Sequence, residues 1–257
     1  MGKIIAITNQ KGGVGKTTTS INLSAAMALK GKKVLLVDTD PQGNATSGLG
    51  INKSKENKNL YSLMIENADI GECIRKTAID KLHVLPSSID LAGAEIELVN
   101  VMAREFVLKT ALEQVKDKYD FIFIDCPPSL GLLTLNSLSA ADSVLIPIQC
   151  EFYALEGLGQ LVNTINLIQK KLNPGLEIEG ILLTMYEARR NLTQQVTDEV
   201  KKHFKDKVYP VMIPRNVRLS EAPSHGVPIA LYDKKSKGTK SYKDLANYVI
   251  KVNKVQH

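Results

Sequence analysis

The residues between positions 11 and 18 have the types and the spacing of a loop that holds phosphate. They read Lys11-Gly12-Gly13-Val14-Gly15-Lys16-Thr17-Thr18. Glycines let backbone N–H groups point inward, and a helix that follows offers its N-terminal amides and positive dipole end to phosphate oxygens. Lys16 would supply a charge near the β- and γ-phosphates, Thr17 a hydroxyl for Mg²⁺, and Thr18 a hydroxyl for the α-phosphate. We therefore predict that the chain binds ATP with Mg²⁺; the alternative is an ordinary glycine-rich turn before a helix.

The start of this loop departs from the usual phosphate-loop pattern. Six residues before Lys16 the pattern has glycine, whereas this chain has Gln10. The next residue is an additional lysine, Lys11. Lys11 is either part of the nucleotide site or an ordinary solvated surface lysine.

Two carboxylates follow strongly apolar runs. Asp38 comes after residues 34–37 and Asp125 after residues 121–124. Such runs are typical of strands buried on both faces, and ligands bind at the carboxyl edge of a parallel sheet. A buried carboxylate is costly unless it holds a cation, and Mg²⁺ prefers oxygen ligands. We predict that Asp125 and, as a more distant member, Asp38 belong to the Mg²⁺ site; the alternative for both is a capping carboxylate.

Strand-like and helical patterns alternate along the chain. The expected strands are residues 3–8, 34–38, 82–85, 121–125, 143–148, 178–184 and 208–212. The expected helices are residues 17–30, 90–118, 156–172, 192–204 and 239–253, and residues 51–59 are expected to form a surface loop. This order predicts an α/β fold in one domain, residues 1–257, with a mostly parallel twisted sheet and helices on both faces.

The overall composition is that of an ordinary globular protein. Of 257 residues, 44% are apolar and 23% are charged. No apolar run approaches the roughly 20 residues that span a bilayer. The N-terminal residues are expected to form the first strand rather than a signal peptide. The three scattered cysteines lack metal-ligand spacing and suggest reduced thiols in a cytoplasmic protein.

The positive charge is concentrated near the C-terminal end. Residues 187–257 hold 15 Lys+Arg against 7 Asp+Glu, whereas the rest of the chain has a net charge of −2. A basic surplus confined to one end favours a polyanion partner over a general solubilising role. A solvated face without any partner is the alternative.

The loop and several later segments resemble the deviant-Walker (SIMIBI) P-loop ATPases, whose loop reads Lys-Gly-Gly-x-Gly-Lys-Thr-Thr. The resemblance covers nearly the whole chain. Residues 37–44, 121–129, 147–158 and 213–223 are similar to the chromosome-encoded ParA proteins, often called Soj.

This resemblance assigns roles within the nucleotide site. It implies that Lys11 reaches across a dimer interface to the partner's ATP, so that nucleotide binding and dimerisation are linked. It also implies that Asp40 positions the attacking water, since phosphoryl transfer depends on positioning and charge compensation. Pro214 would pack against the adenine ring and Asn216 would meet its polar edge. Slow hydrolysis of ATP to ADP and phosphate is expected, with Lys11, Lys16, Asp40 and Asp125 as the catalytic residues.

The resemblance also implies a use for the basic end. Proteins of this kind bind double-stranded DNA without sequence preference, act with a ParB-type partner that stimulates hydrolysis, and associate with the nucleoid. Contacts to phosphate are salt-sensitive and carry no sequence information. Arg189 and Arg218 are the strongest individual candidates. The other basic candidates are Arg190, Lys201, Lys202, Lys205, Arg215, Lys234, Lys235, Lys237 and Lys240.

Three other functions share the same loop. A MinD-like membrane-cycling regulator would need an amphipathic C-terminal helix, but the spacing of Leu245, Tyr248, Val249 and Val252 fits a helix packed on the core. No membrane partner is therefore expected. A nitrogenase iron protein would need cysteine pairs that this chain lacks. A metabolic or assembly ATPase without a DNA role stays open.

Overall fold

Seven strands form the central sheet of the protein, which we describe from a computed structural model covering residues 2–151 and 154–254. The strands are β1 (Lys3–Ile7), β2 (Val34–Asp38), β3 (Arg75–Lys76), β4 (Leu82–Leu85), β5 (Phe121–Asp125), β6 (Ser143–Gln149) and β7 (Glu177–Thr184). Their order in the sheet is β3-β4-β2-β5-β1-β6-β7, and only the β3–β4 pair is antiparallel. The five parallel pairings confirm the expected mostly parallel α/β fold.

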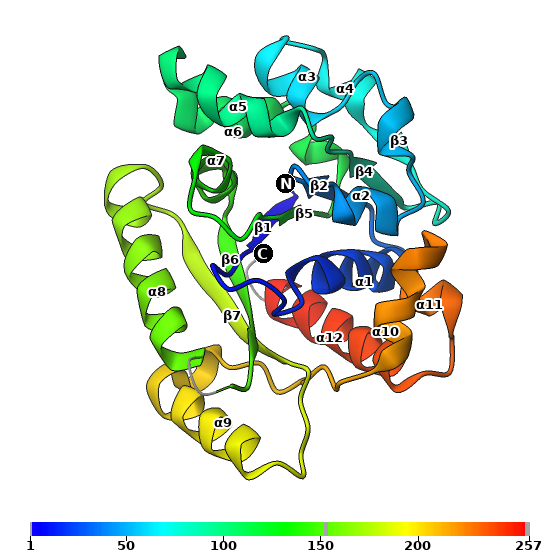
Figure 1. The fold of residues 1–257 in the computed structure, drawn as a ribbon, viewed down its shortest axis with the longest axis vertical. Coiled ribbons are helices and arrows are strands. Elements are labelled where there is room, and N and C mark those ends of the chain that lie inside the picture. The colour runs from blue at the N-terminus through cyan, green and yellow to red at the C-terminus, as the bar shows by residue number, and fades with distance from the viewer. Residues whose placement is uncertain (1, 152–153, 255–257) are drawn as a thin grey trace.

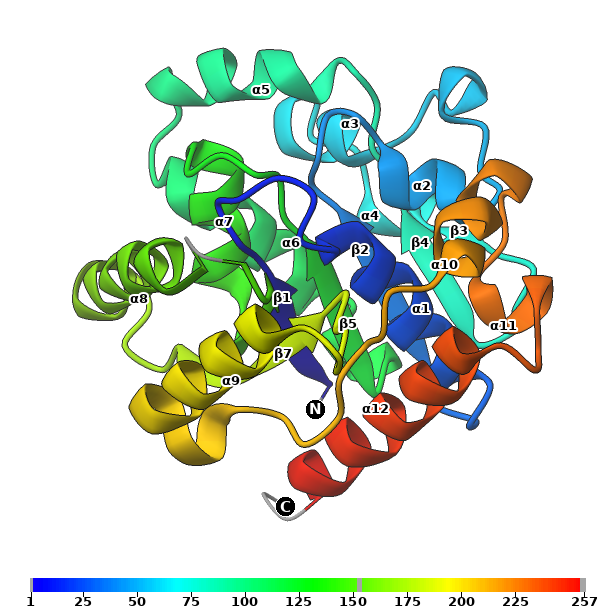
Figure 2. The ribbon, with the colours of Figure 1, turned by 60° about the horizontal axis from the view of Figure 1, so that its bottom comes forward.

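Helices cover both faces of this sheet (Figures 1 and 2). The longer helices are α1 (Lys16–Ala28), α5 (Leu91–Glu97), α6 (Val107–Glu113), α7 (Leu132–Ala140), α8 (Ala154–Lys171), α9 (Asn191–Phe204) and α12 (Lys237–Lys254). The shorter helices are α2 (Asn44–Gly48), α3 (Leu60–Ile65), α4 (Ile70–Cys73), α10 (Val217–Glu221) and α11 (Ile229–Tyr232). In the part of the chain that the structure describes, six single turns of 3-10 helix join them, at Lys53–Lys55, Leu98–Asn100, Arg104–Phe106, Lys116–Lys118, Lys205–Lys207 and Ala222–His225.

Alternate residues of each central strand supply two separate cores. In β1, Ile4 and Ala6 pack on the side of α5, α6, α7 and α8, whereas Ile5 and Ile7 pack on the side of α1 and α12. This division follows from the two-residue period of a strand, and it explains why β2 and β5 are apolar up to their final aspartates. Leu245 and Val249 of α12 are fully buried in the second core, as the sequence predicted.

Two expected elements differ from the structure. Residues 208–212 were expected to form a strand, but only Val208 bridges to β7, and Pro210 lacks the N–H that a regular ladder needs. Residues 90–118 were expected to be helical, and they form two helices, α5 and α6, with three 3-10 turns rather than a continuous helix. The break includes Ala103, whose φ of 55° is left-handed.

Other expectations on the chain are met or fall outside the described residues. The three cysteines are free and buried. The stretch 51–59 is a loop with one 3-10 turn. In the segment 147–158, residues 152 and 153 lie outside the described residues, as do residues 255–257. Over residues 2–151 and 154–254, no helix has the length and apolarity that crossing a membrane would require.

Candidate functional site

The loop between β1 and α1 is shaped to hold an anion. Gly13 and Gly15 have φ values of 75° and 87°, which favour glycine because a Cβ would be strained there. A Cβ placed on Gly12 or Gly13 would meet no atom within 4 Å, so the space beside these two glycines is open. Gly15 caps α1 without a side-chain bond, and the first turn of α1 contains no acidic residue. Its amides therefore remain free for phosphate oxygens.

The two lysines of this loop lie in different surroundings. Lys16 is only 7% exposed, and its Nζ donates to the carbonyl oxygen of Lys11 at 3.2 Å. Burial lowers the pKa of Lys16, and the nearby Asp125 carboxylate opposes that effect. Lys11, by contrast, is exposed and forms an ion pair with Glu151. One lysine is thus held inside the loop, and the other extends from its rim.

Asp125 is a buried carboxylate, and only one of its two oxygens accepts a hydrogen bond from the described residues. Ser20 of α1 donates to Asp125 Oδ1 at 2.7 Å, whereas Oδ2 is buried and has no hydrogen-bond partner among the described residues. Burial, and next the Asp38 carboxylate, raise the pKa of Asp125 to about 8, while the hydroxyls of Ser20 and Thr17 oppose the rise. A buried carboxylate oxygen without a donor is what a cation would stabilise. Asp125 and Thr17 therefore fit Mg²⁺.

Asp38 lies opposite Asp125 on the neighbouring strand, but its oxygens are already engaged. Asp38 Oδ2 accepts from Thr46 N at 2.8 Å and from Thr46 Oγ1 at 2.7 Å, while Oδ1 accepts from the Asp40 N–H at 3.2 Å. Burial raises the pKa of Asp38 to about 6. This geometry favours a role in holding the loop of residues 39–46 over direct metal binding.

The described residues contain no group of three or more His, Cys, Asp or Glu side chains that could hold a metal ion alone. A Mg²⁺ ion bound through Asp125 and Thr17 would need phosphate oxygens and water to complete its shell. That requirement is typical of Mg²⁺ at nucleotide sites. The site therefore fits Mg²⁺ together with a nucleotide better than Mg²⁺ by itself.

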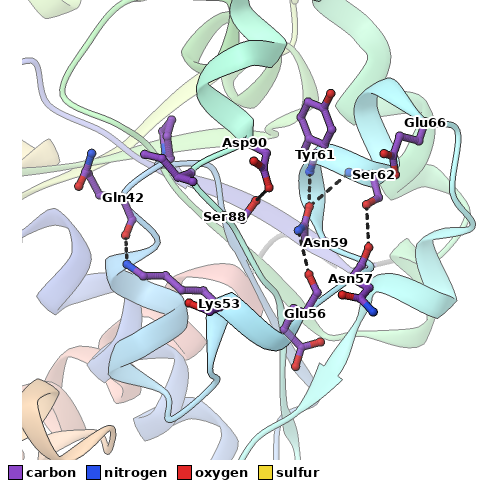
Figure 3. A pocket seen from close by; sticks show the side chains of 13 residues that line it. Gln42, Lys53, Glu56, Asn57, Asn59, Tyr61, Ser62, Glu66, Ser88 and Asp90 are labelled. Carbon is purple, nitrogen blue, oxygen red and sulfur yellow. Dashed lines mark hydrogen bonds between the residues drawn. The ribbon is translucent and has the colours of Figure 1, made fainter.

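Asp40 lies in the loop after β2, beside a polar cleft of about 530 Å³. Asp40 Oδ1 accepts from the Gln42 N–H at 2.9 Å. Lys53 Nζ donates to the carbonyl oxygen of Gln42 on the same side of the cleft, as Figure 3 shows. The opposite wall includes Tyr61 and Asp90. The cleft is separate from the phosphate loop, but one of its walls is the segment that carries Asp40.

A second cleft, of about 380 Å³, adjoins the phosphate loop and contains the two residues expected near adenine. Pro214 and Asn216 line it together with Gly15 and Thr18. Asn216 Oδ1 accepts from the Arg218 N–H at 2.9 Å and so caps α10. The structure therefore brings residues from the two ends of the chain to one nucleotide-sized cleft.

The basic candidates are spread over separate elements. Arg189 and Arg190 precede α9, Lys201 and Lys202 end it, Arg218 lies on α10, and Lys235 and Lys237 lie at the start of α12. All seven are exposed. Several already have acidic neighbours: Arg190 pairs with Glu187, Lys202 with Glu199, and Arg218 with Glu221 and Asp233. Unlike the nucleotide residues, they form no compact cluster.

Three residues of the site were missed by sequence reasoning. Ser20 holds Asp125, Thr46 holds Asp38, and Glu151 pairs with Lys11. Ser20 could have been found, because it lies four residues after Lys16 on the same face of the expected helix. Thr46 and Glu151 carry no local signal, since their roles depend on how distant segments pack.

Comparison with known proteins agrees with this geometry. A family model described as an AAA domain matches residues 2–178. The sporulation initiation inhibitor protein Soj of Bacillus subtilis is 64% identical over 249 residues, covering 97% of this chain and 98% of that protein. The chromosome partitioning protein ParA of Myxococcus xanthus is 56% identical, covering 98% and 89%.

A solved structure shows that the similarity includes the fold. Cobyrinic acid a,c-diamide synthase from Mycobacterium smegmatis, with bound ADP and magnesium, superimposes with a TM-score of 0.88 at 36% identity. The match covers 100% of this chain and 97% of that one. The identities over nearly full length show that the chain belongs to the ParA/Soj family of P-loop ATPases.

Proposed function

We propose that this protein is an ATP-dependent switch that dimerises around its nucleotides, hydrolyses ATP slowly, and acts in chromosome or plasmid partitioning. The observation that supports the proposal is that two lysines of one loop lie in different surroundings. Lys16 is buried within its own phosphate loop, whereas Lys11 extends from the rim. An exposed lysine at the edge of a phosphate site is well placed to meet the phosphates of a second copy.

In this proposal the bound nucleotide is held from three sides. The amides of residues 12–18 and Lys16 hold the phosphates, Thr17 and Asp125 hold Mg²⁺, and Pro214 and Asn216 contact adenine. Asp40 positions the water. Mg²⁺ supplies compensation of the negative charge that builds up on the phosphates during transfer.

Lys11 can exchange one ion partner for another, and this exchange links ATP binding to dimerisation. In the single chain Lys11 pairs with Glu151, and both side chains are partly exposed. Such a surface pair contributes little stability, so Lys11 can leave it for the stronger charge of a triphosphate. ATP then stabilises the dimer, and the dimer stabilises bound ATP, by the same coupling free energy.

Light scattering on the wild type and on Lys11→Ala tests this link. We expect the wild type to be dimeric with ATP and monomeric with ADP, and Lys11→Ala to bind ATP but stay monomeric. Lys171→Ala, an exposed lysine at the end of α8, is the matched control and should dimerise normally. ATP-dependent dimers of Lys11→Ala would contradict the proposal.

The basic C-terminal end supports a DNA partner. A dimer presents twice the number of basic residues, and each additional phosphate contact multiplies the binding constant, so dimerisation would switch DNA affinity on. The protein would then be cytoplasmic and nucleoid-associated, and a ParB-type partner would speed hydrolysis and release it. The names of the Bacillus and Myxococcus relatives support partitioning as the role.

One rival function has a specific observation behind it. The solved structure with a TM-score of 0.88 is named a cobyrinic acid a,c-diamide synthase, which is a metabolic activity. Its 36% identity is well below the 64% of the Soj relative, and so we rank it second. Filter binding with unrelated duplex DNA, with and without ATP, separates the two, because only the partitioning role requires ATP-dependent DNA binding.

A further inference from the structure

A run of exposed apolar side chains borders the nucleotide edge of the protein. We call Ile89, Ile96, Val99, Val101 and Met102 the apolar ledge. Ten large apolar side chains are exposed among the described residues, and half of them belong to this short segment. Met102 is 94% exposed and Ile96 is 75% exposed. Concentrated apolar exposure of this kind marks an interaction surface, whereas scattered single residues do not.

The helix that carries the ledge is apolar on two opposite sides. On the inner side of α5 and the following 3-10 turn (Leu98–Asn100), Leu91, Ala94 and Leu98 are fully buried against the core. On the outer side, Ile96 and Val99 follow the helical spacing of three and face solvent. The outer side of a surface helix normally carries polar residues, so apolar residues there are unusual. The outer side therefore lacks a partner in the single chain.

The ledge begins at the edge of the sheet where the nucleotide residues lie. β4 ends at Leu85, and the chain leaves it at the same carboxyl edge as the ends of β1, β2 and β5. The Ser87 N–H donates to Thr46 Oγ1 at 3.0 Å, and Thr46 in turn holds Asp38. Ile89 then lines the polar cleft beside the Asp40 loop.

The same helix also touches the loop that follows Asp125. α5 contacts α7, and the two lie side by side in Figures 1 and 2. A Cβ on Gly131, the residue before α7, would collide with Glu95 Oε1, which is buried and has no hydrogen-bond partner among the described residues. Leu130, next to this contact, is 38% exposed. The helix behind the ledge therefore lies between the loop of Asp40 and the loop after Asp125.

We infer that the apolar ledge is a contact surface for a second copy of this chain, and that packing on it positions both loops of the nucleotide site. The inference rests on the proposed ATP dimer. A second copy is the occupant because the chain reaches the ledge from the carboxyl edge of the sheet, the same edge at which the loop that carries Lys11 leaves β1. A two-fold axis through that edge would bring the same patch of both chains together.

Introducing a negative charge into the apolar ledge tests this assignment. Ile96→Asp and Met102→Asp should fold normally, because both side chains are exposed, and their monomers should bind ATP as the wild type does. We expect their ATP-dependent dimerisation constants, from analytical ultracentrifugation, to weaken by tenfold or more. Leu167→Asp is the matched control, because Leu167 is 57% exposed on α8, a different helix, and its dimerisation should be unchanged.

Hydrogen exchange on the unmutated protein gives a second, independent measurement. Amides of residues 91–104 should exchange more slowly with a non-hydrolysable ATP analogue than with ADP, and this protection should depend on protein concentration. Normal dimerisation of both ledge variants, or unchanged exchange in a dimeric wild type, would overturn the ledge assignment and leave the proposed dimer intact.

Other outcomes also have definite meanings. A wild type that stays monomeric with ATP would overturn both the proposed dimer and this inference. Normal dimerisation of the ledge variants with loss of partner-stimulated hydrolysis would assign the ledge to a partner protein, and would equally overturn a second copy as its occupant.

Discussion

The nucleotide edge and the basic C-terminal surface are built in opposite ways. At the nucleotide edge, Lys16, Asp38 and Asp125 are buried, and each makes at least one hydrogen bond at a fixed position. On the basic surface the candidates are exposed, and several pair with nearby acids, as Arg218 does with Glu221. Buried charges need fixed partners, whereas exposed charges act by number and are screened by salt.

This difference determines how each region should respond to mutation. Removing one group from the buried edge leaves another group without its partner, so single changes should have large effects. Removing one charge from the basic surface deletes one of several weak contacts. Four substitutions should show this difference, with effects that decrease from the buried nucleotide edge to the exposed basic surface.

Lys16→Ala is expected to have the largest effect. It removes the buried cation of the phosphate loop, and a hydrogen bond to a charged group contributes about 1.5–3 kcal/mol. ATP affinity, measured by calorimetry with Mg²⁺, should fall about 10- to 100-fold. Lys171→Ala is the control and should bind ATP normally. A Lys16→Ala variant with unchanged affinity would mean that the backbone amides alone hold the phosphates.

Asp125→Asn should raise the stability of the nucleotide-free protein and abolish its Mg²⁺-dependent binding of ATP. Because the pKa of Asp125 is raised to about 8, its contribution to the free energy of unfolding is fully present below about pH 4 and is lost as the pH rises through 8. Without nucleotide, the variant should therefore be more stable than the wild type by about 1–3 kcal/mol at pH 8. The gain should shrink at pH 5, and the variant should lose its Mg²⁺-dependent ATP binding.

Thermal unfolding at the two pH values, with and without Mg²⁺ and ATP, provides the measurement. Asp117→Asn, an acidic residue in the 3-10 turn before β5, serves as the control and should show no such pH-dependent gain. An Asp125→Asn variant that is less stable than the wild type at pH 8 would mean that the bond from Ser20 outweighs the cost of burying the charged carboxylate.

Much of the fold could be predicted because both strand faces are buried. Residues 34–37 and 121–124 are apolar throughout, so their type and place in a parallel sheet were recognisable from the sequence alone. The failures occurred where the sequence lacks this signal. Val208 and its neighbours are apolar but contain Pro210, and the helical pattern of residues 90–118 hides a turn at Ala103.

The candidate site divides in the same way. The phosphate loop was predictable because a strand, a glycine turn and a helix are consecutive in the sequence. The pairing of Lys11 with Glu151 was not, since it joins residues 140 positions apart. The apolar ledge was not predicted either, because Leu98 and Val99 look equally apolar in the sequence and only packing buries the first and exposes the second.

Arg189→Glu should weaken DNA binding at moderate salt by about tenfold. No change in ATP binding is expected, because Arg189 is exposed before α9 and lies outside the nucleotide clefts. Each phosphate contact contributes about one unit to the slope of log K against log salt, so that slope should also fall. Filter binding over a salt series gives both quantities. Lys171→Glu is the matched charge reversal, and an equal loss in that variant would show that net charge alone governs DNA binding.

Glu221→Gln should produce the smallest effect, and in the opposite direction. Arg218 is held by Glu221 at 2.8 Å, and this contact lowers the pKa of Glu221. Neutralising Glu221 leaves Arg218 only its longer contact with Asp233, at 3.7 Å, so ATP-dependent affinity for unrelated duplex DNA should rise about two- to threefold. Glu72→Gln is the control, because Glu72, on α4, forms an exposed ion pair with Lys58 and its substitution also removes one negative charge. If both variants gain equally, the basic surface responds only to net charge; a gain confined to Glu221→Gln would identify Arg218 as a residue whose position matters.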